Sequence, residues 1–196
     1  MTVIFEDELL TGEIRSAIHD FALAARQVLM DEARDLLEGV YGLRKNGTLE
    51  PPENLPALQE PETMKTYQEL SRLLDNEVSA GLEREEAVEK LIKETAFTHL
   101  NRLVAFKMME VSRLIRETVG RGPDSNGLKF YVVDHPEAEK LWNQGQKEQA
   151  YRYFLIWQTG QIAREVSSLF DPNDMPSRLF PRFSALTAVL NMLNSA

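Results

Sequence analysis

The residue types that most often carry catalysis are sparse in this sequence and do not cluster. The three histidines, His19, His99 and His135, are far apart, and the 196 residues include no cysteine. None of the histidines belongs to an HxxxH or HExxH pattern, which would place two ring nitrogens on one face of a helix for a metal ion. We therefore expect neither a zinc site nor thiol chemistry in this chain.

Nuclease, nucleotide-binding and serine-hydrolase motifs are also absent from the sequence. No lysine has an acidic residue two places before it, and no GxSxG or GxxxxGK[ST] motif occurs. The close pair Gly120 and Gly122 follows an expected helix, as in a helix C-terminal stop. Adjacent carboxylates such as Glu85 and Glu86 lie in charged helical runs typical of a solvated face. The sequence thus predicts no catalytic, cofactor-binding or metal-binding residue.

One expected helix carries a group of basic residues. On a helical wheel of residues 95–116, Arg102, Arg113 and Arg116 lie opposite a broad apolar face. Such a face can contact DNA phosphates or an acidic partner domain. It can also be a solvated face with charge pairs three and four residues apart, which the sequence alone favours. Lys107 lies toward the apolar side within one turn of Glu110, and we expect these two to form a structural pair at the core margin.

The second half of the chain contains an aromatic group with helical spacing. Tyr151, Tyr153, Phe154 and Trp157 could form a platform on which nucleobases stack. Their spacing and the single basic neighbour, Arg152, favour packing within a core instead.

The net charge of −9 argues against this chain being the main clamp on DNA. A local basic face is still compatible with that charge, because charges are screened within roughly 10 Å at moderate salt. No apolar run approaches the roughly 18 residues that a membrane span needs. Together with the absence of cysteine, this predicts a cytoplasmic protein without a membrane partner.

Hydrophobic periodicity indicates which elements must position these residues. It predicts long helices separated by proline- and glycine-rich breaks, over residues 11–41, 62–78, 83–119, 146–170 and 183–194, with a short helix after Pro136. The run 128–133 is expected to be a short strand or an extended edge segment. The predicted fold is all-α: one multi-helix, bundle-like domain over 1–196, with 1–82 and 83–196 as an alternative subdivision.

Two segments resemble a known family. The stretch ETAFTHLNRLVAFKMME, residues 94–110, resembles a helix in the N-terminal region of large adenine-specific DNA methyltransferases. These are the enzymes of phage-exclusion (BREX, PglX-like) systems and of related fused restriction–modification proteins. The stretch LFDPND, residues 169–174, followed by LFPR, residues 179–182, is similar to a segment that precedes the methyltransferase core in that family.

The resemblance implies transfer of a methyl group from S-adenosylmethionine to N6 of adenine by the full-length parent, which extrudes the base from the duplex. This chain lacks the family's Asn/Asp-Pro-Pro-Tyr/Phe motif, and its Pro51-Pro52 pair is flanked by Glu50 and Glu53. We therefore expect a non-catalytic N-terminal domain, truncated from a longer chain whose core binds the cofactor.

Within that parent, the expected partners are the methyltransferase core and, through the full-length protein, DNA, with Arg102, Lys107, Arg113 and Arg116 as candidate contacts. The alternative is a helical protein–protein interaction or oligomerisation module unrelated to methylation. A Gly-containing strand–turn and an NPPY-type motif encoded beyond Ala196 would distinguish the first hypothesis from the second.

Overall fold

The computed structural model describes residues 12–195, and this part of the chain is all-α, as predicted. It contains α-helices and short 3₁₀ turns but no strand, apart from an isolated bridge between Leu43 and Leu49. The helices are α1 (Gly12–Gly39), α2 (Pro61–Ser79), α3 (Arg84–Val111), α4 (Asn126–Asp134), α5 (Pro136–Asn143), α6 (Lys147–Ile162), α7 (Met175–Arg178) and α8 (Phe183–Ser195). Within these residues, no helix is both long and apolar enough to cross a membrane.

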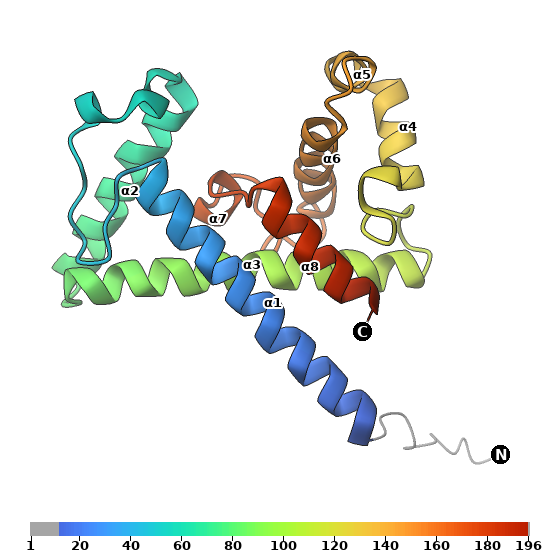
Figure 1. Ribbon diagram of the computed structural model, residues 1–196, viewed down its shortest axis with the longest axis horizontal. Coiled ribbons are helices and arrows are strands. Elements are labelled where there is room, and N and C mark those ends of the chain that lie inside the picture. Colours follow the sequence, from blue (N-terminus) through green and yellow to red (C-terminus); the bar gives the residue numbers. More distant parts are fainter. Residues whose placement is uncertain (1–11, 196) are drawn as a thin grey trace.

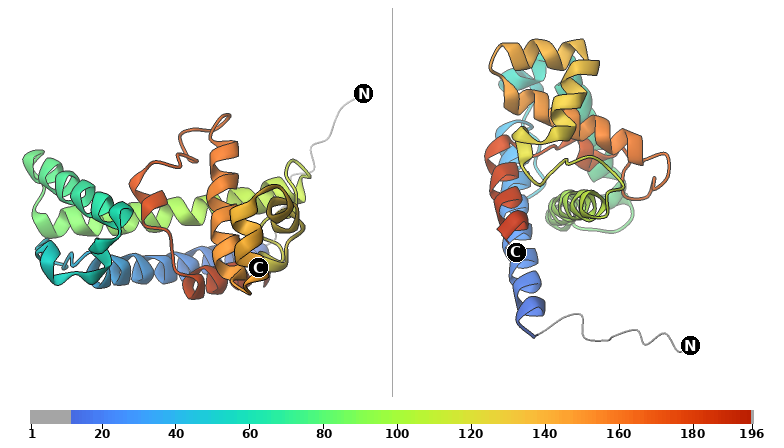
Figure 2. Two further views of the ribbon diagram at one scale, coloured as in Figure 1. Left: turned by 90° about the horizontal axis from the view of Figure 1, so that it is seen from above. Right: turned by 90° about the vertical axis from the view of Figure 1, so that its right-hand side faces the viewer.

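The two longest helices, α1 and α3, cross one another, and the other elements are arranged around them (Figure 1). At one end, α2 and the proline-containing connection of residues 40–60 pack against them. At the other end stand α4, α5 and α6, while α8 lies along α1. Seen from above, α1 and α3 form two separate layers (Figure 2).

Two hydrophobic cores form on this frame, one at each end. One contains Ala33 and Leu37 of α1, Leu70 of α2 and Leu91 of α3. The other is built on the remaining parts of α1 and α3, and it also takes side chains from α4, α5, α6 and α8. Each core therefore contains residues from both sides of position 82, and the long helices connect the two.

Helix starts follow local signals that the sequence carries. Glu86 accepts a hydrogen bond from the Glu83 backbone N–H at 3.2 Å, which completes a capping box at the start of α3. Asp174 accepts from Ser177 N–H at 2.8 Å and so caps the short helix α7. Proline occupies the first turn of α2 and α5, where its missing N–H costs no helical hydrogen bond.

The expected strand or extended segment at 128–133 is wrong, because these residues belong to helix α4. The Ser125 side chain caps this helix by accepting from Leu128 N–H at 3.4 Å. Leu128, Tyr131 and Val132 are buried at helical spacing, whereas Phe130 and Val133 are exposed. The valines and aromatic residues of this run suggested a strand, but burial of one helical face against α6 decides the structure.

Two predicted helix ends also differ from the structure. Helix α3 ends at Val111 instead of residue 119, in a Schellman motif where Leu114 N–H donates to Met109 O at 2.9 Å. Helix α6 ends at Ile162 instead of residue 170, because the chain beyond it turns back toward α3. The predicted first residue of α1, at position 11, lies outside the described part of the chain.

Two helical glycines should respond in opposite ways to substitution by alanine. A Cβ at Gly127 of α4 would collide with the Glu117 carbonyl oxygen and lie 2.8 Å from Phe154 Cζ, whereas one at Gly160 of α6 would meet nothing within 4 Å. We expect Gly127→Ala to lower the free energy of unfolding by about 1–3 kcal/mol through overpacking. Gly160→Ala should raise it by about 0.5–1 kcal/mol. Urea denaturation followed by circular dichroism measures both, and a neutral Gly127→Ala would contradict the tight packing of α4.

Candidate functional site

Arg102 does not belong to an exposed basic face, and this corrects the expectation for that residue. Its side chain is buried, with 4% of the residue exposed. Nε donates to Leu169 O at 2.7 Å, and Nη2 donates to Asp171 O at 3.0 Å and to Asp174 Oδ2 at 2.7 Å. Burial lowers the pKa of Arg102, while the charge of Asp174 opposes that shift. Arg102 is therefore an internal link between α3 and the segment 169–177.

His99, one helical turn before Arg102, contacts Leu179 and Phe180, which follow the segment that Arg102 binds. Its Nε2 lies 3.1 Å from Leu179 O, and its ring meets Phe180 edge-on at 5.6 Å between centroids. Burial, and secondly the positive charge of Arg102, lower the pKa of His99 to about 4. The neutral ring then donates its Nε2–H to the carbonyl oxygen. Residues 94–110 and residues 169–182 are thus hydrogen-bonded directly to each other.

Lys107 and Glu110 do not form the expected pair but take separate partners. Lys107 Nζ donates to Asn194 Oδ1 at 2.7 Å and so connects α3 to the end of α8. Glu110 Oε2 accepts from the backbone N–H groups of Thr118, Val119 and Gly120 at 2.7, 2.9 and 3.1 Å. Glu110 therefore organises the turn that follows α3, and Lys107 is occupied within the fold.

Of the four predicted contact residues, Arg113 and Arg116 lie free at the surface. Both are exposed, and neither has an ion pair with another described residue. The Arg116 guanidinium lies 3.9 Å from the centroid of the Phe130 ring. Arg113 has a φ of 58°, which makes it the one non-glycine residue with a positive φ in the described chain.

The end of α3, the turn that follows it and the nearby helix α4 also carry large exposed apolar side chains. We call this region the α3–α4 corner and define it by its arginines, Lys129 and the exposed apolar residues of α3, α4 and the turn between them: Met108, Val111, Leu114, Phe130 and Val133. Leu114 is 75% exposed. The stretch 107–129 holds five basic and three acidic residues, although the chain as a whole is acidic. The corner thus combines local positive charge with exposed apolar surface, as interaction sites do.

A half-open groove of about 220 Å³ lies at this corner, between α4, α6 and the turn after α3. We call it the aromatic groove; its wall includes Phe130, Tyr131, His135 and Trp157, with Arg116, Asp134 and Gln158 as polar groups. Tyr131 stacks on His135 at 3.9 Å between centroids, and Trp157 lies 5.2 Å from Tyr131. Sequence reasoning missed the groove because its wall comes from helices that the sequence does not place side by side.

The aromatic group of α6 divides between packing and the groove. Tyr151 and Phe154 are buried, and Tyr151 OH donates to Thr118 O at 2.9 Å, so the expected packing role is confirmed for these two. Trp157 is only partly buried and lines the groove.

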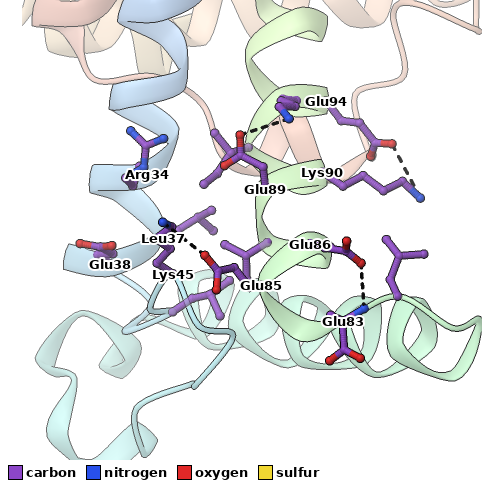
Figure 3. A pocket seen from close by; sticks show the side chains of 15 residues that line it. Arg34, Leu37, Glu38, Lys45, Glu83, Glu85, Glu86, Glu89, Lys90 and Glu94 are labelled. Atoms are coloured by element: carbon purple, nitrogen blue, oxygen red, sulfur yellow. Dashed lines mark hydrogen bonds and ion pairs between the residues drawn. The ribbon is translucent and has the colours of Figure 1, made fainter.

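A larger hollow of about 960 Å³ lies at the opposite end of the molecule, between α1 and the first half of α3 (Figure 3). Two of its lysines pair with carboxylates of the same hollow: Lys45 with Glu85 at 3.2 Å and Lys93 with Glu89 at 3.2 Å. In residues 12–195, no three or more His, Asp or Glu side chains gather in a way that could hold a metal ion. The unpaired charges of the α3–α4 corner make that corner the stronger candidate site.

Comparisons with protein-family models, with curated proteins and with solved structures find no match to this chain.

The buried His99 should make folding stability depend on pH. Its pKa is about 4 in the folded protein and 6.5 in the unfolded chain, so the unfolded chain binds a proton more readily between these values. Stability from the neutral ring is therefore complete above pH 6.5 and is lost as the pH falls toward 4. We expect the free energy of unfolding to fall by about 3 kcal/mol over this window from His99 alone.

Urea denaturation at several pH values measures this dependence. His99→Gln keeps an amide donor for Leu179 O but does not titrate, so it should flatten the profile in this range. His19→Gln, at an exposed position of α1, serves as the matched control and should leave the profile unchanged. An equally steep profile in His99→Gln would show that other groups carry the dependence.

Proposed function

We propose that this chain is the non-catalytic N-terminal helical domain of an N6-adenine-specific DNA methyltransferase from a restriction–modification or phage-defence system. It packs against the methyltransferase core and contacts DNA through the α3–α4 corner. The assignment to this enzyme class rests on the resemblance of residues 94–110 and 169–182. Its structural support is that these two segments bond to each other through Arg102 and His99 and so form one unit. In this proposal the core, not this chain, binds S-adenosylmethionine.

The observation that carries the DNA contact is the pair of exposed cations at the corner. Arg113 and Arg116 have no acidic partner among the described residues, so both charges are available to phosphate oxygens. Elsewhere on the described surface many cations are already paired with carboxylates, as Lys45 is with Glu85. Because the acidic remainder of the chain repels a polyanion, the corner is the favoured side for DNA to approach.

The backbone at Arg113 gives a second reason to assign it a role beyond folding. It occupies the left-handed position that follows a helix in a Schellman motif, where glycine is the usual residue. A side chain there costs roughly 1–2 kcal/mol. Strained backbone of this kind is concentrated at functional sites, and here it presents a free guanidinium at the surface.

Substitutions at the two arginines separate DNA contact from stability. Arg113→Gly should raise the free energy of unfolding by about 1 kcal/mol, because it removes the backbone strain. The same substitution should weaken binding to a fluorescein-labelled DNA duplex, measured by anisotropy at several salt concentrations. Arg113→Gly and Arg116→Ala should each reduce the slope of log K against log salt by about 0.9.

Arg72→Ala is the matched control, since Arg72 is an exposed arginine of α2 at the other end of the molecule. Its salt slope should equal that of the unsubstituted chain. Slopes that do not change in the corner variants would contradict the DNA contact. For the enzyme class, the coding sequence beyond Ala196 should encode a Gly-containing strand–turn followed by an NPPY-type motif, and its absence would reject the assignment.

A second candidate function is docking or oligomerisation through the apolar part of the same corner. Met108 and Val111 are 65% and 70% exposed, which is unusual for large apolar side chains. In this case the chain should form a dimer in light scattering coupled to size exclusion, and Leu114→Glu should convert it to a monomer. A monomer at all concentrations would reject self-association.

A further inference from the structure

The aromatic groove is lined by side chains of which only some are buried in the core. Tyr131 and Phe154 are buried and belong to the core. Phe130 is 52% exposed, and His135 and Trp157 are partly buried, so the groove opens an aromatic surface to solvent. His135 meets Trp157 edge-on at 5.4 Å, which fixes the orientation of both rings.

The groove has the dimensions and planar surfaces that a single aromatic ring system requires. Its volume is about 220 Å³, and an apolar cavity of about 150 Å³ is known to hold benzene. The Arg116 guanidinium lies over the Phe130 ring, 3.9 Å from its centroid, and also borders the groove. Aromatic rings and guanidinium planes are the two kinds of surface on which unstacked nucleobases lie in protein complexes.

The polar groups at the groove can form hydrogen bonds with the edge of a base. The Asp134 carboxylate can only accept hydrogen bonds at neutral pH, and the Gln158 amide can both donate and accept. Exocyclic amino groups and ring nitrogens of a base present the complementary donors and acceptors. Arg116 belongs both to this groove and to the cations of the corner, so a strand held by its phosphates also brings its bases to the groove.

We propose that the aromatic groove binds one unpaired nucleobase of a DNA strand whose phosphates contact Arg113 and Arg116. This inference rests on the proposed function, because it uses the same DNA contact and adds a site for a base. An apolar side chain of a protein partner would also fill the groove. The free arginine charges and the donor and acceptor groups beside Phe130 favour a nucleic acid, which carries both phosphates and polar ring edges.

Fluorescence of Trp157 tests the proposal directly. The chain has two tryptophans, so Trp142→Phe leaves Trp157 as the single reporter. Two short single-stranded DNAs of equal length are compared, one with a single adenine at its centre and abasic residues elsewhere, the other abasic throughout. We expect both to bind with the same salt slope, and the adenine-containing strand to bind about tenfold more tightly and to quench Trp157.

Matched phenylalanine variants locate the effect. Phe130→Ala should remove the tenfold advantage of the adenine strand and leave binding of the abasic strand unchanged. Phe130→Tyr retains the ring and should retain the advantage. Phe97→Ala is the control, because Phe97 is also a largely exposed phenylalanine, 60% exposed, on the first half of α3 outside the groove. Because both phenylalanines are exposed, we expect neither substitution to unfold the chain, and circular dichroism verifies the fold.

Each remaining outcome overturns a specific proposal. Equal affinity for the two strands without quenching, at an unchanged salt slope, would reject the base site and leave the DNA contact standing. An adenine-dependent gain that survives Phe130→Ala would place the base elsewhere and reject the groove. Failure of both strands and of duplex DNA to bind would reject the base site together with the proposed DNA contact.

Discussion

The arrangement of the second half of the molecule depends on the hydrogen bonds of the buried Arg102 guanidinium. It sits inside the protein on α3 and binds the carbonyl oxygens of Leu169 and Asp171 together with the carboxylate of Asp174. The backbone between α6 and α7 forms no regular structure, so these carbonyls need donors from elsewhere. A buried guanidinium needs acceptors just as much, and removing either side would leave buried polar groups without partners.

This link positions the last helix. Beyond the segment that Arg102 binds, the chain continues to Leu179, whose carbonyl oxygen is hydrogen-bonded to His99. It then reaches Arg182, whose backbone and side chain both donate to Glu32 of α1. Glu32 therefore serves as an acceptor at the beginning of α8, where helical N–H groups have no internal partner. In this way the start of α8 is linked to both long helices, and its apolar face packs into the core.

The polar side chains of α3 and of the turn after it differ in whether the fold provides them with partners. Polar groups of the second half of α3 form hydrogen bonds within the fold: Arg102 with the 169–177 segment, Lys107 with Asn194 and Glu110 with the backbone of 118–120. Arg113 and Arg116 follow the end of the helix and remain outside. The α3–α4 corner is therefore basic because the chain leaves the helix at Val111, and the aromatic groove lies beside it because α4 and α6 pack against each other there.

The sequence by itself determined the all-α class, the positions of α1, α2 and α8, and the absence of familiar catalytic motifs, because periodic burial and short motifs are local properties. It could not determine that Arg102 is internal, since its partners lie 67–75 residues away and the wheel of one helix cannot show what packs over it. The helical state of 128–133 and the groove between α4 and α6 likewise depended on tertiary packing. Two of the four expected contact residues, Arg113 and Arg116, thus remain free at the surface. Which residues stay free depends on the path that the chain takes after each helix. That path is a property of the folded molecule and not of local sequence.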